Sequence, residues 1–309
     1  MGTVAYPEMQ KFKYSPRLSC GSIAAGGTLS SLIPPSAPLI VFGVLTNTSI
    51  SKLFIGGILP GIMLSALYIL VIIAMCTYNP KLGPPGPSSS LKEKIVSLKG
   101  VIGALCLFVV VMGGMFVGIF TPSEAGTIGA FGAFIIIIAK RQFNKNSLVA
   151  VLKGAIIGTC FVLTITIGAM IFTNFLTVSG FTSMFQGWVK ALPLSPTLIM
   201  VCIVILYLVL GCFMDALAMM LLTLPIIFPI VASLGYDPLW YGILQTLLAE
   251  VALVTPPVGL NAYIVHGVTK VPLQDVFMGI MPFFVMMVIG IVFLFLFPQI
   301  VTFLPGIMN

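Results

Sequence analysis

Long apolar runs recur along the whole chain, and several of them can cross the ~30 Å hydrocarbon core of a membrane. Residues 53–77, 154–177 and 275–298 are examples. Only 7% of the residues are charged and 59% are apolar, which lies far outside the composition of a soluble domain. Because a backbone in lipid must satisfy its hydrogen bonds internally, these runs predict an all-α polytopic membrane protein.

Basic residues gather in three groups between the apolar runs, and groups of this kind mark cytoplasmic loops. The groups are Lys11, Lys13 and Arg17; Lys81, Lys92, Lys94 and Lys99; and Lys140, Arg141, Lys145 and Lys153. We therefore interpret the net charge of +7 as a topology signal, not as a nucleic-acid footprint. On this topology 20–45 runs outward, and 240–267 runs inward if 197–234 forms a re-entrant hairpin around GCFMD (211–215).

The C-terminal third repeats the N-terminal part at one constant offset, without a gap. The offset is the one that places Pro34-Pro35 on Pro256-Pro257, so two apolar spans are interrupted at the same place by a double proline. At this offset Tyr6-Pro7 also meets Phe228-Pro229, and Pro60 meets Pro282. Matched discontinuous helices that run in opposite directions are typical of secondary transporters with inverted repeats.

Each double proline predicts an unwound point in the membrane. Proline removes a backbone donor and moves the preceding residue, here Ile33 or Thr255, away from helical geometry. The freed carbonyls must face protein, water or a bound ion. The half-helices that follow present the positive ends of their dipoles to an anionic substrate.

Around the two breaks lie side chains with neutral oxygen atoms that could coordinate a sodium ion, and a glycine that lets the backbone approach it closely. Thr28, Ser30 and Ser36 lie near the first break. Thr255, Gly259 and Asn261 lie near the second.

Three acidic residues lie within or beside apolar sequence and have competing interpretations. Asp215, at the turn of the predicted hairpin, serves either as a helix cap or in ion or proton linkage. Glu250 either lines the bundle interior for function or is structural. Glu124 is predicted to complete a capping box with Thr121, with Pro122 at the first helical position.

At these residues a family resemblance becomes plain. The segments GSIAAGGTLSSLIPPSAPLIVFGVLTNTSISKLFIGGILPG (21–61), GIFTPSEAG (118–126), GCFMDALAMMLLTLPIIFPI (211–230) and LVTPPVGLNAYIVHG (253–267) resemble the large, DctM-like membrane subunit of tripartite ATP-independent periplasmic (TRAP) transporters. The resemblance implies an elevator-type carrier in the inner membrane that imports a dicarboxylate, sialic acid or other sugar acid, driven by Na⁺. It also implies two partners, a small four-helix membrane subunit and a periplasmic substrate-binding protein.

The resemblance carries over a set of ion- and substrate-binding residues. These are Gly26, Gly27, Thr28, Ser30, Pro34, Pro35, Ser36, Gly211, Asp215, Thr255, Pro256, Pro257, Gly259 and Asn261. Sodium is expected among Thr28, Ser36, Gly211, Asp215, Thr255 and Gly259. Ser30 stands where the family usually has glycine.

The same repeat predicts that the first copy is incomplete, because the counterparts of Gly211 and Asp215 would precede Met1. We therefore expect a C-terminal fragment that does not transport alone. Its predicted parts are a remnant of the first hairpin with the first broken helix and following span (1–78), a cytoplasmic linker (79–99), scaffold and connecting helices (100–194), and the second hairpin, second broken helix and last span (195–309).

Two other functions remain open on the sequence. One is a sodium- or proton-coupled carboxylate carrier that needs no binding protein. The other is an energy-coupling subunit of a respiratory complex, for which Asp215 and Glu250 offer only a sparse proton relay. An enzyme is disfavoured, because the chain has one histidine, His266, and lacks metal-ligand spacing and a Ser/His/Asp set.

Overall fold

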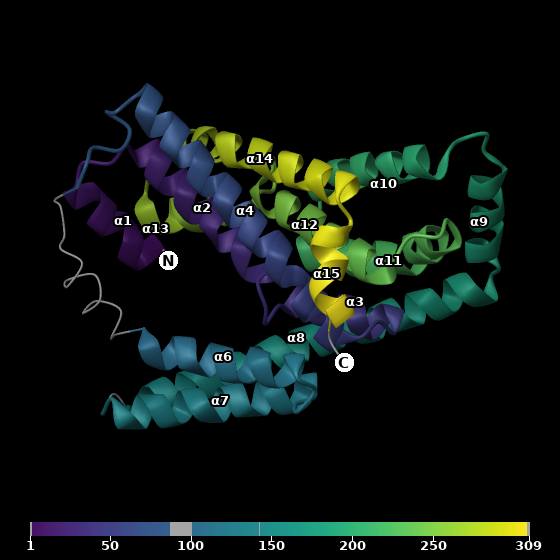
Figure 1. Cartoon of the computed structure of the whole chain (residues 1–309), viewed down its shortest axis with the longest axis horizontal. Coiled ribbons are helices and arrows are strands. Elements are labelled where there is room, and N and C mark those ends of the chain that lie inside the picture. The colour runs from purple at the N-terminus through teal and green to yellow at the C-terminus, as the bar shows by residue number, and fades with distance from the viewer. Residues whose placement is uncertain (1, 87–100, 142, 308–309) are drawn as a thin grey trace. The chain divides into compact units, whose positions relative to one another are not determined.

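The computed structural model describes residues 2–86, 101–141 and 143–307, and every regular element among them is a helix (Figure 1). The chain divides into two compact units. One comprises residues 1–86 and 173–306, and the other comprises residues 87–172 with 307–309. Most of the predicted linker, with Lys92, Lys94 and Lys99, lies outside the described residues.

The smaller unit contains α6 (Ile102–Phe116), α7 (Pro122–Ala139) and the larger part of α8 (Lys145–Val178). Helices α6 and α7 pack against each other, and Gly118 turns the chain between them with φ +79°. Helix α7 begins with the predicted capping box: the Thr121 backbone N–H donates to Glu124 Oε2 at 2.8 Å, and the Glu124 N–H donates to Thr121 Oγ1 at 3.3 Å. The structural interpretation of Glu124 is confirmed.

The first apolar span of the larger unit is interrupted. Helix α1 (Gly2–Lys11) precedes α2 (Pro16–Leu32), which stops before the double proline, and α3 (Ala37–Thr46) starts after it. Helix α4 (Ile50–Tyr78) then returns as one continuous helix that contains Pro60.

The C-terminal part has the same succession of elements. Helix α12 (Pro238–Val254) stops before its double proline, α13 (Leu260–Thr269) follows, and α14 (Leu273–Leu296) and α15 (Gln299–Ile307) end the chain. Both ends of α12 lie at the repeat offset from the corresponding ends of α2, since Pro16 corresponds to Pro238 and Leu32 to Val254. The local backbone is therefore repeated together with the sequence.

A helical hairpin precedes α12. Helix α9 (Phe181–Ala191) leads into α10 (Pro196–Gly211), and α11 (Ala216–Ser233) turns back after residues 212–215 (Figure 1). Helices α10 and α11 pack against each other and against α12. The Tyr207 hydroxyl lies 2.6 Å from Thr223 Oγ1 and 3.2 Å from the Tyr241 hydroxyl, which joins the hairpin to α12.

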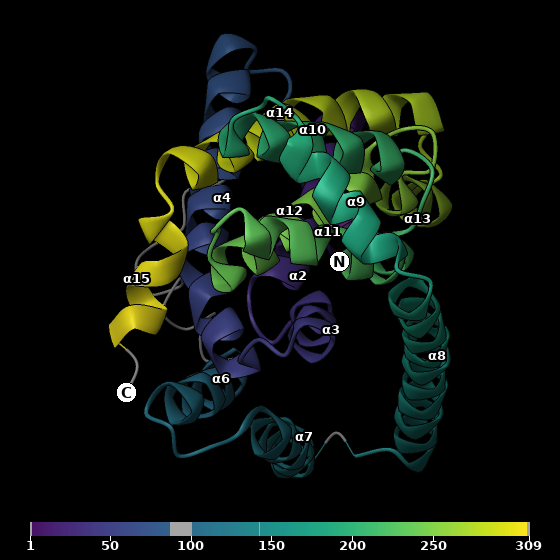
Figure 2. The ribbon, with the colours of Figure 1, turned by 90° about the vertical axis from the view of Figure 1, so that its right-hand side faces the viewer.

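Helix α12 is the centre of the larger unit, and every residue from Trp240 to Ala252 is buried. Figure 2 shows it surrounded by α2, α4, α10, α11 and α14. Helices α2 and α14 approach most closely at a glycine pair. A Cβ on Gly21 would lie 2.0 Å from the Gly279 carbonyl oxygen, so no larger residue fits there without a shift of backbone.

Six helical segments of the described chain are long and apolar enough to cross a membrane. Their exposed faces are apolar too, as Ile69, Ile73 and Phe175 illustrate. These features agree with the prediction of a polytopic membrane protein.

Candidate functional site

The first break is buried and capped by a side chain. Ile33 has extended geometry, with φ −81° and ψ 123°, and the Pro34-Pro35 peptide bond is cis. Ser36 is 1% exposed and caps α3, accepting a hydrogen bond from the Leu39 N–H at 3.3 Å. The Ser36 hydroxyl also donates to the Ser31 carbonyl oxygen at the end of α2. One hydroxyl therefore connects the two half-helices.

Thr28 is buried one turn before the first break. Its hydroxyl donates to the Ala25 carbonyl oxygen at 2.7 Å and lies 3.2 Å from the Tyr68 hydroxyl of α4. Ser30 points elsewhere: it is exposed, and its hydroxyl donates to the Gly27 carbonyl oxygen at 2.7 Å. The two predicted hydroxyls thus lie in different environments.

The second break has nearly the same backbone but less cover. Thr255 has φ −89° and ψ 130°, and the Pro256-Pro257 peptide bond is also cis. Its hydroxyl donates to the Val251 carbonyl oxygen at 2.6 Å. Both prolines and Val258 are exposed, whereas at the first break Pro34 is buried and only Pro35 is exposed.

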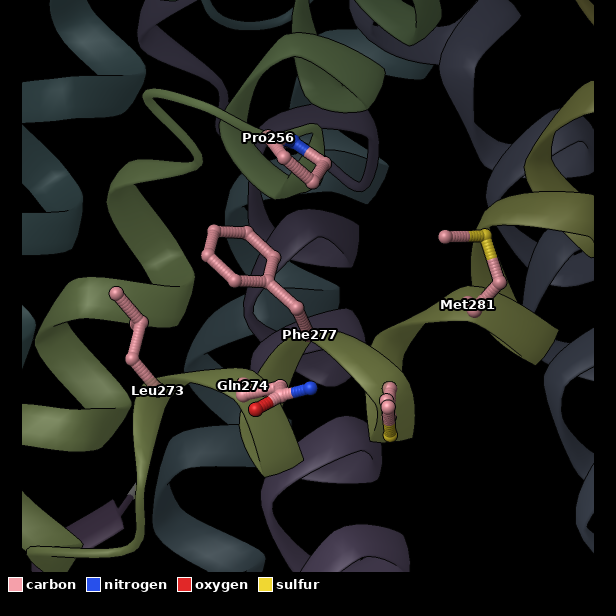
Figure 3. Close-up of a pocket in the computed structure, with 6 residues that line it drawn as sticks. Pro256, Leu273, Gln274, Phe277 and Met281 are labelled. Atoms are coloured by element: carbon pink, nitrogen blue, oxygen red, sulfur yellow. The ribbon is translucent and has the colours of Figure 1, made fainter.

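Gly259 is the N-cap residue of α13 and lies in the left-handed region, with φ +40°. A Cβ at this position would lie 2.7 Å from the Phe277 ring, so both the backbone and the available space require glycine. Phe277 points toward Pro256 and helps line a cavity of about 650 Å³ between the second break and α14 (Figure 3). The side chains lining this cavity are almost all apolar.

Asn261 joins the second broken helix to the first. Its side-chain amide donates to the Ala24 carbonyl oxygen of α2 at 3.3 Å, and a Cβ on Gly27 would lie 3.5 Å from its Nδ2. Gly26, Gly27, Ser30 and Asn261 line one cavity of about 280 Å³ together with apolar residues of α2 and α13. Segments from the two halves of the repeat are thereby brought together.

The tip of the hairpin lies against α12 near the second break. A Cβ on Gly211 would lie 2.7 Å from the Ala252 Cβ, less than one turn of helix before Thr255. Asp215 is exposed and caps α11, where its carboxylate accepts from the Leu217 N–H at 3.1 Å. The capping interpretation of Asp215 therefore has direct geometric support.

The residues expected to hold sodium form two groups in the structure. Thr28 and Ser36 lie beside the first break, while Gly211, Thr255 and Gly259 lie beside the second, with Asp215 at the hairpin turn. Among the described residues, no cluster of three or more His, Cys, Asp or Glu side chains offers a site for a transition metal.

Two aromatic partners of the site escaped sequence reasoning. The Tyr68 hydroxyl bonds Thr28, and the Phe277 ring packs against Gly259. Tyr68 and Phe277 lie in helices that are apolar on every face, so the sequence pattern does not show which neighbours they contact. Only the Tyr68 hydroxyl gave a signal, because a buried phenol needs a hydrogen-bond partner.

Comparisons with known proteins identify the family of the chain. Residues 1–300 match the family model described as "Tripartite ATP-independent periplasmic transporter, DctM component". The C4-dicarboxylate TRAP transporter large permease protein DctM of Pseudomonas aeruginosa is 33% identical over 99% of this chain and 70% of its own length. The 2,3-diketo-L-gulonate TRAP transporter large permease protein YiaN of Escherichia coli is 32% identical over 97% and 70%. The sialic acid TRAP transporter large permease protein SiaM of Vibrio cholerae is 28% identical over 99% and 71%.

Proposed function

Because this chain belongs to the DctM component family of tripartite ATP-independent periplasmic transporters and is a multi-pass membrane permease, we propose that it carries an organic anion inward with Na⁺ as the coupling ion. The observation that carries the proposal is the hydrogen bond from the Asn261 side chain to the Ala24 carbonyl oxygen. It holds the first and second broken helices together beside one cavity.

The proposed substrate is a carboxylate of the dicarboxylate, sialic acid or sugar-acid class. The relatives named above act on C4-dicarboxylate, 2,3-diketo-L-gulonate and sialic acid, which all bear a carboxylate. No Lys or Arg lies in 20–45 or 240–267. The N-terminal ends of α3 and α13, which carry the positive ends of the helix dipoles, would supply the positive potential that such a substrate needs.

Sodium coupling is supported by the chemistry of the donors. Hydroxyl and carbonyl oxygens are hard ligands, and both breaks gather them without a basic side chain. Ser36 and Thr28 supply this chemistry at the first break, and Thr255 supplies it at the second.

An elevator-type movement of an inverted repeat is supported by equivalent contacts in the two halves. Gly21 of α2 meets Gly279 of α14. Their repeat counterparts, Ile243 of α12 and Gly57 of α4, meet as well. A body held together by such paired contacts suits rigid movement across the bilayer.

Two partners are part of the proposal: a small four-helix membrane subunit, and a periplasmic binding protein that delivers the anion. The test is uptake of a labelled carboxylate by liposomes that contain this chain and the small subunit. Under this proposal any uptake should require both the binding protein and an inward sodium gradient, and such uptake would also refute the expectation that this chain does not transport alone. Uptake that persists without the binding protein would support the binding-protein-independent carrier instead, and uptake driven by a proton gradient alone would contradict sodium coupling.

A further inference from the structure

Glu250 is an acidic side chain in the most deeply buried helix of the molecule. It lies on α12, little more than one turn before Thr255, and is 0% exposed. Neither carboxyl oxygen has a hydrogen-bond partner of normal geometry among the described residues, so no basic side chain is paired with it. An ionised carboxylate without partners at membrane depth is very costly.

Two hydroxyl-bearing side chains of neighbouring helices lie near Glu250 without a hydrogen bond to its carboxyl oxygens. They are Ser31, in the last turn of α2, and Tyr68 of α4. The positions of the hydroxyl protons decide whether these groups can donate a hydrogen bond to Glu250. Thr28 gives its proton to the Ala25 carbonyl oxygen, so Tyr68 must be the donor in the Tyr68–Thr28 bond. The Tyr68 proton is therefore not available to Glu250, so of these two neighbours only the Ser31 hydroxyl could donate to a carboxylate.

The surroundings therefore provide acceptors for a carboxylic acid and too few donors for a carboxylate. A carboxylate has about four lone-pair sites to satisfy. A neutral acid needs one acceptor for its O–H, and the Ser31 oxygen can fill that role.

The other ionisable groups on helices packed against α12 are engaged elsewhere or lie at helix ends. Arg17 pairs with Asp275 at 2.7 Å, and His266 Nδ1 lies 2.7 Å from the Val271 carbonyl oxygen. The Tyr207 hydroxyl bonds Tyr241 and Thr223, and the Tyr263 hydroxyl donates to the Pro257 carbonyl oxygen. Lys52 lies at the exposed start of α4, and Tyr78 lies at the end of that helix. The thiols on these helices belong to Cys20, Cys76 and Cys202.

Glu250 also occupies an equivalent position in the internal repeat. Glu250 is the repeat counterpart of Thr28, so the same place in the two broken helices holds a hydroxyl in one and an acid in the other. Both side chains are fully buried, and the Thr28 hydroxyl lies 3.2 Å from the Tyr68 hydroxyl.

We propose that Glu250 is a proton-binding site at the contact between α2 and α12, with the Ser31 hydroxyl as the acceptor for its acid O–H. A metal ion at this position would need several oxygen ligands in addition to the Glu250 carboxylate, whereas a proton needs only one acceptor. Ionisation requires water, so the proton leaves when water reaches this contact, which links proton release to movement of the two broken helices.

The test is infrared spectroscopy of the purified chain in lipid bilayers at neutral pH, which does not depend on transport activity. We expect the carbonyl band of a protonated carboxylic acid, lost in Glu250→Gln and retained in Glu124→Gln. Glu124 is a matched control, because the Thr121 N–H and hydroxyl both donate to its carboxylate at 2.8 Å. Absence of the band from the unmodified chain, or its persistence in Glu250→Gln, would overturn the proposal.

A second variant protects the test if Glu250→Gln does not fold. Ser31→Ala keeps the acid but removes its acceptor, so we expect the acid band to move to higher frequency. An unchanged band in folded Ser31→Ala would show that the acid does not bond Ser31. Because no substrate or partner is needed, failure of the transport proposal would leave this result intact, and the reverse also holds.

Discussion

The two broken helices share a backbone and differ in how each break is held. Ile33 and Thr255 have almost equal dihedral angles, and the helices before them have the same length. At the first break a buried serine, Ser36, caps the next helix. At the second, the equivalent position holds Val258, and Gly259 begins α13 with positive φ beside an open cavity.

This difference indicates that the double proline determines where the helix is interrupted. The residues that follow determine how the next helix is capped and how exposed the break is. The first break is fastened by a hydroxyl within the bundle. The second is less covered, because both of its prolines are exposed whereas Pro34 at the first is buried, and the start of α13 depends on glycine. We infer that a ligand has easier access to the second break than to the first.

The largest expected effect is that of Gly259→Val. A β-branched residue at φ +40° is strained, and its side chain would collide with the Phe277 ring. Left-handed geometry and overpacking together cost roughly 2–5 kcal/mol in the free energy of unfolding. The control is Gly26→Ala, where a Cβ meets open space. Equal stability of the two variants in urea titrations would contradict the role given to Gly259.

A smaller effect is expected at the first break. Ser36→Ala removes the cap of α3 and the bond to the Ser31 carbonyl, with a loss of about 1 kcal/mol in unfolding free energy. Ser30→Ala, at an exposed hydroxyl, should change stability by less than about 0.5 kcal/mol. If Ser30→Ala costs as much as Ser36→Ala, the first break is not held by its cap.

How far the sequence predicts these features depends on the kind of signal. The breaks at Pro34-Pro35 and Pro256-Pro257 and the capping box at Thr121 could be predicted, because proline and cap chemistry act within a few residues. The inverted repeat and the sodium ligands remain predictions.

Contacts between helices could not be predicted. Tyr68 with Thr28, and Asn261 with Ala24, depend on how each helix is rotated about its axis. In soluble proteins the periodicity of apolar residues reveals that rotation, but helices that are apolar on all faces carry little such signal. For the same reason the sequence left Glu250 ambiguous until its neighbours were seen.

The link between the two breaks is predicted to contribute about as much as an ordinary hydrogen bond. Asn261→Leu should lower unfolding free energy by about 1 kcal/mol, because the Ala24 carbonyl loses a donor. Sodium-dependent uptake should fall more than stability suggests, since the cavity loses its one amide. Asn144→Leu, in the other unit, is the control, and uptake unchanged in Asn261→Leu would separate this residue from the site.

The smallest effect concerns a charge pair present in only one half. Arg17 pairs with Asp275, whereas the repeat counterpart of Arg17 is Leu239. Side chains that are 56% and 33% exposed are well screened, so Arg17→Leu should cost at most about 1 kcal/mol in unfolding free energy, and less in high salt. A larger, salt-independent loss would indicate that Arg17 holds the two helices by packing.

The most direct test of the central claim, that the two interrupted helices meet at one cavity, is a disulfide between Gly27→Cys and Asn261→Cys with the six native cysteines replaced. We predict that mild oxidation in membranes joins these two positions, as detected by mass spectrometry of the linked peptides, while Gly27→Cys with Asp215→Cys stays unlinked. Failure of the first pair to link in folded protein, or equal linking of both pairs, would contradict it.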